Sequence, residues 1–173
     1  RLSGVNSINW ARIAAQVVYY FTAASALGSP HRPVSFAVPT GNFGDVHAGW
    51  IAKQMGLPIG RLAIGTNSND ILARTLETGV YEMRGVSATS SPSMDIQVSS
   101  NFERLLFDAG RRDSAAVKRQ MAGLSQSGAF TIDPSTLRAI QAAFVAAKTD
   151  EAATLGTMSS AYREAGYLAD PHT

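Results

Sequence analysis

The sequence predicts an α/β fold built on a parallel sheet. Residues 34–38 form a short segment that is apolar on both faces, which is typical of a strand at the centre of a parallel sheet. A helical pattern follows, and residues 61–66 form the next strand pattern, so the three segments make a βαβ unit. The two strands should be parallel with a right-handed crossover, and the turns that follow them should share one edge of the sheet.

The composition is that of a globular domain. Of the 173 residues, 45% are hydrophobic and 16% are charged, and the net charge of +2 is too small to indicate a nucleic-acid surface. The absence of cysteine excludes disulfides and thiolate metal sites. No apolar run approaches a membrane span and no signal peptide is visible, so a cytoplasmic protein is expected. The chain begins at Arg1 and stops just after a helical pattern, which suggests a piece of a longer polypeptide.

The turn after the first strand is the candidate site. Pro39 ends the strand's hydrogen-bond ladder, and Gly41 and Gly44 are expected to allow a tight turn or a positive φ. The following helix, opening near Val46, would present unpaired N–H groups and the positive end of its dipole, which favours a phosphate. Alternatively, Asp45 simply caps the helix, and its carboxylate would then compete with an anion.

A long helix is expected before this strand, ending near Gly28, with Asn6 or Ser7 as its N-cap. Its apolar positions form a broad face, so the helix should be largely buried. These positions are Ile8, Ile13, Ala15, Val17, Val18, Phe21, Ala24 and Leu27. From these residues alone, Asn6 and Ser7 would be capping residues and Arg12 a solvated helix residue.

The second half of the chain predicts further helices. We expect a helix over residues 71–78, capped by Asn69 or Asp70, and another over about 99–108. Residues 114–124 should form a short amphipathic helix, with a brief extended piece at 130–132. Pro134 should begin a helix that reaches Lys148. The last helix, about 151–166, should present an apolar face of Leu155, Met158, Ala161 and Tyr162.

Metal and hydrolase sites are not indicated. His31, His47 and His172 are scattered without ligand spacing, so no metal site is expected. No Ser-His-Asp or paired-carboxylate arrangement can be argued either.

Several motifs, in order, resemble threonine synthases, which are fold-type II pyridoxal-phosphate enzymes. The turn resembles their phosphate loop: Pro39-Thr40-Gly41-Asn42-Phe43-Gly44-Asp45. Asn6, Ser7 and Arg12 match a stretch that helps to hold the substrate's phosphate in that family. Further similar segments are residues 66–70 with Arg74 and Gly79, residues 91–96, residues 101–104 and residues 167–173.

The resemblance implies a three-layer, tryptophan synthase β-like domain, present in part, with extra C-terminal helices. Residues 1–173 would be part of the pyridoxal-phosphate domain, and 109–133, where the resemblance is weakest, a variable insertion. Pyridoxal phosphate would bind at Gly41, Asn42, Phe43, Gly44 and Asp45, and O-phosphohomoserine at Asn6, Ser7 and Arg12. Asn67, Asn69 and Asp70 would have supporting roles, and residues 91–96 would be an ordered connection rather than a flexible linker.

The resemblance also implies the reaction of the full-length protein: O-phospho-L-homoserine and water would give L-threonine and phosphate. The family's Schiff-base lysine lies upstream in a Phe-Lys-Asp context that Lys53, Lys118 and Lys148 lack, so this piece has no catalytic residue and should be inactive alone. One alternative is a serine or threonine dehydratase, which Arg12 with Asn6 and Ser7 disfavours because a dehydratase holds no substrate phosphate. Another is a catalytically silent, threonine-synthase-like binding protein.

Overall fold

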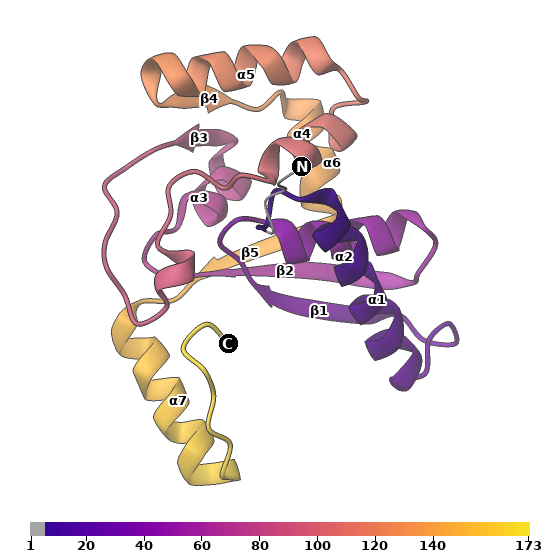
Figure 1. Ribbon diagram of the computed structural model, residues 1–173, viewed down its shortest axis with the longest axis vertical. Coiled ribbons are helices and arrows are strands. Elements are labelled where there is room, and N and C mark those ends of the chain that lie inside the picture. The colour runs from indigo at the N-terminus through magenta and orange to yellow at the C-terminus, as the bar shows by residue number, and fades with distance from the viewer. Residues whose placement is uncertain (1–5) are drawn as a thin grey trace, which may run out of the picture.

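The computed structural model describes residues 6–173 and is organised around a parallel sheet (Figure 1). The sheet has three strands in the order β1-β2-β5, and both neighbouring pairs are parallel. The strands are β1 (Val34–Pro39), β2 (Ile59–Thr66) and β5 (Phe144–Lys148). The predicted α/β class and the βαβ unit are therefore confirmed.

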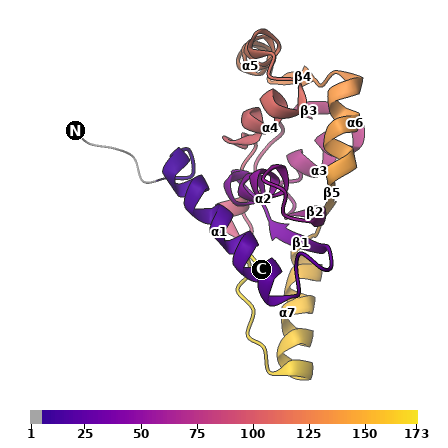
Figure 2. The ribbon, with the colours of Figure 1, turned by 90° about the vertical axis from the view of Figure 1, so that its right-hand side faces the viewer.

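Two helices cover one face of this sheet, α1 (Trp10–Ala26) and α2 (Gly44–Gln54) (Figure 2). Tyr20 of α1 packs edge-on against Phe36 of β1, with ring centroids 4.9 Å apart, and the Leu62 side chain lies under α2 beside Gly49. The opposite face of β1 and β5 is largely uncovered, because the side chains that point to it are exposed: Ser35, Ala37, Val145 and Ala147. Residues 6–173 thus supply the sheet and one helical layer of the predicted three-layer domain.

The other elements extend from the carboxyl edge and from β5. The helices α3 (Ile71–Thr78) and α6 (Pro134–Ala143) lie beside β5 in both views (Figures 1 and 2). A two-stranded antiparallel ribbon, β3 (Val80–Glu82) with β4 (Ala129–Thr131), packs against α5 (Ser114–Ser127). The helix α4 (Phe102–Ala109) lies between α5 and α6, and the short 3₁₀ helix η1 (Pro92–Met94) lies against the loop after β1.

One predicted helix is partly wrong. The helix that begins at Pro134 ends at Ala143, and the next five residues form β5 rather than a continuation of the helix. Alanine-rich residues 142–148 have a local preference for helix, but pairing with β2 from Leu62 to Thr66 overrides it. This strand places the Phe144 ring in the core, against Phe43 and Trp50.

The first helix is less buried than predicted. Only Ile13, Val17, Tyr20 and Ala24 are buried, whereas Val18 and Tyr19 are about 60% exposed (59% and 63%). Its N-cap is Asn9, whose side chain accepts from the amide of Ala11, and not Asn6 or Ser7. Asn9 has the extended backbone that an N-cap requires, because the chain turns at residues 7–8 before the helix begins.

The last helix, α7 (Glu151–Ala165), lies where it was predicted and is capped by Asp150, but it buries no side chain. Leu155 and Tyr162 of the predicted apolar face are 50% and 59% exposed. Figure 1 shows α7 projecting away from the sheet. Its apolar face therefore contacts no core within residues 6–173.

Candidate functional site

The loop after β1 turns sharply into α2, and the residue that makes this turn is Phe43. Its φ is +66°, whereas Gly41 and Gly44 have ordinary φ values, so of the two predicted uses of these glycines, a tight turn or a positive φ, the positive φ is not found. A left-handed residue other than glycine costs about 1–2 kcal/mol. Burial of the Phe43 ring, 5.3 Å from the Phe102 ring and 5.9 Å from the Phe144 ring, offsets this cost with about 1.5–3 kcal/mol. The aromatic ring thus anchors the loop in the core.

Gly41 is required for a different reason, close approach to η1. A Cβ on Gly41 would lie 2.7 Å from the Ser93 carbonyl oxygen and 3.2 Å from the Met94 Cα. A Cβ on Gly44 would meet its nearest atoms at 3.6 Å, which is ordinary contact. Of the two loop glycines, Gly41 is the one that packing demands.

The carbonyl groups of the loop are tied back to the segment before α4. The Ser99 hydroxyl donates to the Gly41 carbonyl (2.8 Å), and the Asn101 amide and side chain both donate to the Asn42 carbonyl (3.1 and 2.9 Å). Within residues 6–173, no group accepts a hydrogen bond from the amides of residues 41–45. These amides, at the N-terminus of α2, are therefore free to bind an anion.

Asn101 also brings the N-terminal segment to the loop. This fully buried side chain donates to the Ser7 carbonyl (2.9 Å) and accepts from the Arg104 guanidinium (3.0 Å), which in turn donates to the Ile8 carbonyl (2.9 Å). Sequence reasoning missed this supporting role of Asn101. In the sequence, Asn101 is visible only as a polar residue before a helix, which does not indicate its distant partners.

A cavity of about 160 Å³ opens where these segments meet, with room for about five waters at ~30 Å³ each. It is lined by Ser7, Arg12, Gln16, Pro39, Thr40, Gly41, Asn42, Phe43, Gly44, Asp45 and Val46. Seven of the eight predicted site residues thus lie around one cavity. The eighth, Asn6, is exposed outside it, where its side chain accepts from the Ile8 amide (3.1 Å).

Arg12 is the cationic group of this cavity. Its guanidinium has no hydrogen-bond or ion-pair partner among residues 6–173. A free guanidinium and a row of free amides on one small cavity form an arrangement suited to phosphate oxygens.

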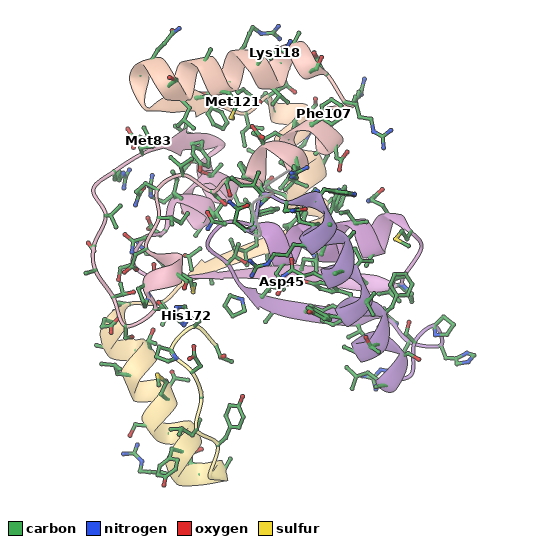
Figure 3. All side chains as sticks on the ribbon, viewed as in Figure 1. Asp45, Met83, Phe107, Lys118, Met121 and His172 are labelled. Carbon is green, nitrogen blue, oxygen red and sulfur yellow. The ribbon has the colours of Figure 1, made fainter. Side chains whose placement is uncertain are left out.

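Asp45 does not cap α2, contrary to the alternative considered above. The helix has no side-chain cap, and the Asp45 carboxylate lies beside the Tyr20 hydroxyl of α1, 3.2 Å away. Partial burial, moderated by this hydrogen bond, raises the pKa of Asp45 above its usual value. Figure 3 shows Asp45 at the junction of α1, α2 and the sheet.

The turn after β2 is held by a polar network and not by helix capping. The Asn67 and Asn69 side-chain amides both donate to the Asp95 carboxylate, at 2.7 and 2.9 Å, and Thr89 donates to it as well. Although burial acts to raise the pKa of Asp95, these hydrogen bonds outweigh it and lower that pKa. Residues 87–96 are thereby fixed as an ordered connection, as the resemblance implied. Asp70 occupies the N-cap position of α3, but its side chain makes no capping hydrogen bond and pairs instead with Arg74 (2.7 Å) and Lys148 (3.0 Å).

The C-terminal tail returns to η1. The His172 Nε2 accepts from the Ser93 amide (3.3 Å), while its Nδ1 lies 2.7 Å from the Asp170 carboxylate. Ser93 is the residue whose carbonyl faces Gly41. Ser93 therefore lies between His172 and the loop after β1, and His172 itself does not line the cavity (Figure 3).

A larger cavity, of about 530 Å³, lies beside β5 and is a weaker candidate. Three of its charged groups are already paired, because Asp70 forms ion pairs with both Arg74 and Lys148. The part of the chain that the structure describes contains no cluster of three potential metal ligands. It also contains no helix long and apolar enough to span a membrane.

Comparison with known proteins agrees with the motifs, although no family model matches the chain. Threonine synthase of Pseudomonas aeruginosa is 48% identical over the whole chain. The crystal structure of pyridoxal-phosphate-bound threonine synthase from Brucella melitensis superposes on 99% of the chain with a TM-score of 0.97 and 64% identity. The chain is homologous to part of threonine synthase. Yeast threonine synthase is more distant, with a TM-score of 0.90 at 43% identity over 97% of the chain.

The matches confirm the resemblance to threonine synthases and the fold class that it implied. This chain spans about 37% of the length of the Pseudomonas and Brucella proteins and 36% of the yeast one. The homologous part thus includes the loop after β1 and the start of α1, which line the 160 Å³ cavity.

Proposed function

We propose that the protein to which this chain belongs is a threonine synthase. It would convert O-phospho-L-homoserine and water to L-threonine and phosphate with pyridoxal phosphate as cofactor. The observation that carries the proposal is the shared cavity of Arg12 and the free loop amides, in a chain that superposes on a pyridoxal-phosphate-bound threonine synthase.

The loop is proposed to hold the phosphate of the cofactor. The amides of Gly41, Asn42, Phe43, Gly44 and Asp45 would donate to its oxygens, and the dipole of α2 favours the negative charge. Because the loop carbonyls are fixed by Ser99 and Asn101, the amides are oriented before the phosphate arrives. The bound cofactor would supply the electron sink for the carbanions of the reaction.

Arg12 and Ser7 are proposed to hold the phosphate of the substrate. The guanidinium offers two parallel donors to a phosphate, and the Ser7 hydroxyl lies on the same cavity. Asn6 would contribute indirectly to phosphate binding, because its side chain accepts from the Ile8 amide and so shapes the turn that carries Ser7. These residues bind and orient the phosphate that leaves, a need that a dehydratase does not have.

This chain alone is proposed to lack the activity. The sequence has three lysines, and none lines the cavity. Lys53 donates to the Ile59 carbonyl, Lys118 lies on α5 at the far end of the molecule (Figure 3), and Lys148 pairs with Asp70. We propose that residues 1–173 are part of the cofactor-binding domain and that 109–133, which form α5 and β4, are a variable addition to it. The cytoplasm is the proposed location.

The direct test uses the full-length protein loaded with pyridoxal phosphate. Incubation with O-phospho-L-homoserine should release phosphate and L-threonine in a 1:1 ratio. Formation of a 2-oxo acid and ammonia from serine or threonine, without phosphate release, would show a dehydratase instead. Cofactor binding without any turnover would show the catalytically silent protein.

The same assay applied to residues 1–173 tests the second part of the proposal. No phosphate release is expected at any cofactor concentration. Mixing this chain with a separately produced upstream segment should restore the absorbance of a lysine-bound cofactor. Turnover by residues 1–173 alone would contradict the assignment of the catalytic lysine to the upstream part.

A further inference from the structure

Asp45 presents a problem for the proposed phosphate site. Its carboxylate belongs to the first turn of α2, where an acidic side chain normally accepts hydrogen bonds from the free amides of the helix. In that position it would occupy the amides that the phosphate needs, and its charge would repel the phosphate. Yet no hydrogen bond joins the carboxylate to a loop amide in the described chain.

The carboxylate is turned toward Tyr20, which comes from a different helix. The Tyr20 hydroxyl lies 2.9 Å from the Asp45 backbone carbonyl and 3.2 Å from its carboxylate oxygen Oδ1, and it can donate to either. No other hydrogen bond to the Asp45 carboxylate occurs within residues 6–173. The direction of the carboxylate therefore depends on one phenol.

The phenol itself is held in place by packing. Tyr20 is 4% exposed, its ring stands edge-on against Phe36, and a Cβ on Gly49 would lie only 2.6 Å from its Cε1 atom. α1 and α2 thus approach closely at Gly49, and the packed ring keeps the Tyr20 hydroxyl beside Asp45. The same helix carries Arg12 two turns earlier, so one element supplies both the cation of the cavity and the donor to Asp45.

We propose that Tyr20 is a positioning residue of the phosphate site. It holds the Asp45 carboxylate away from the loop amides, so that a phosphate and not a side chain occupies them. This inference rests on the proposed function of the loop. It assigns Tyr20 no contact with cofactor or substrate.

A purely structural role for Tyr20 makes a different prediction. If the residue only packs α1 against α2, Tyr20→Phe keeps the ring contacts with Phe36 and Gly49 and should not change phosphate binding. If it positions Asp45, loss of the hydroxyl releases the carboxylate to the amides. One hydrogen bond to a charged group corresponds to about a 10- to 100-fold change in affinity.

The experiment compares pyridoxal phosphate with pyridoxal, which lacks the phosphate, in the full-length protein. Tyr20→Phe should raise the Kd for pyridoxal phosphate about tenfold or more and leave the Kd for pyridoxal unchanged. Tyr19→Phe, on the exposed side of the same helix, is the matched control and should change neither Kd. A melting curve of each variant verifies that the fold is intact.

Repeating Tyr20→Phe in an Asp45→Asn protein shows whether the weaker binding of pyridoxal phosphate is caused by the Asp45 charge or by a general loss of affinity. There the Tyr20→Phe change should alter the Kd for pyridoxal phosphate less than twofold, because no competing charge remains. Asp45→Asn alone should tighten pyridoxal phosphate severalfold, and this arm stands even if Tyr20→Phe fails to fold. Equal losses for both ligands, an undiminished penalty in the Asp45→Asn background, or weaker binding by Asp45→Asn would overturn the inference.

The inference and the proposed function fail in different ways. If the unmodified full-length protein binds pyridoxal phosphate no better than pyridoxal, the phosphate role of the loop is wrong. If it has that preference and Tyr20→Phe retains it, only the role of Tyr20 is wrong.

Discussion

Replacing Gly41 with alanine tests whether the approach of the loop to η1 shapes the phosphate site. The added Cβ would lie 2.7 Å from the Ser93 carbonyl oxygen, several tenths of an ångström inside ordinary contact. The connection that carries Ser93 is pinned by the hydrogen bonds to Asp95, so the loop must move instead. Such overpacking costs about 1–3 kcal/mol, and losing the Ser99 hydrogen bond to the Gly41 carbonyl costs about 0.5–1.5 kcal/mol more.

The displaced amides should then bind phosphate less well. Losing one charge-assisted hydrogen bond, about 1.5–3 kcal/mol, corresponds to at least tenfold weaker binding of pyridoxal phosphate. Fluorescence titration of the full-length protein measures the Kd, and urea unfolding measures the free energy of unfolding. Gly85→Ala is the control, because a Cβ there meets nothing within 4 Å. If Gly41→Ala binds the cofactor as tightly as Gly85→Ala, the close approach of the loop to η1 does not shape the phosphate site.

Three further predictions concern the surroundings of the loop. Arg12→Ala should lower kcat/KM for O-phosphohomoserine about 100-fold without changing the Kd of pyridoxal phosphate, and Arg12→Lys should recover it only in part, since lysine lacks the planar fork; equal kcat/KM for wild type and Arg12→Ala would contradict the role. Asn101→Ala should lower the free energy of unfolding by about 1–3 kcal/mol and weaken cofactor binding, because the half-buried Ser7 and Asn42 carbonyls lose a donor; an unchanged unfolding curve would argue against it. Burial, opposed by Asp108, lowers the pKa of His47 to about 4, so the unfolded chain binds the proton more readily than the folded chain. Roughly 3 kcal/mol of the free energy of unfolding should therefore be lost as pH falls from about 6.5 to 4. His47→Gln should flatten this part of the stability profile, and an unaltered profile would show that His47 is not the cause of the loss.

The local parts of the fold could be predicted from the sequence. The strand, turn and helix around residues 34–54 follow from apolar segments separated by glycine and proline, and their pattern needs no distant partner. The predicted helix Ile71–Thr78 was equally local.

The errors arose where distant contacts decide the structure. β5 exists because β2 pairs along its edge with an alanine-rich segment 82 residues later. The exposed sides of α1 and α7 look like core in sequence, because hydrophobic periodicity shows which residues can be buried and not what buries them.

The candidate site shows the same division. The loop and Arg12 were found because their residue types resemble a known phosphate loop and an anion grip. Asn101 and Tyr20 were not found as supports, because each acts on residues far away in the sequence. Asn101 is 94 residues from Ser7, and Tyr20 is 25 residues from Asp45. No local pattern identifies such partners.

A crystal structure of the full-length protein with pyridoxal phosphate would show directly whether the loop after β1 binds the phosphate. We expect the phosphate oxygens of the cofactor to lie about 2.7–3.2 Å from amides of residues 41–45. We also expect the Asp45 carboxylate to remain beside the Tyr20 hydroxyl. A cofactor phosphate bound elsewhere, with the loop amides in contact only with water or with Asp45, would contradict this role of the loop.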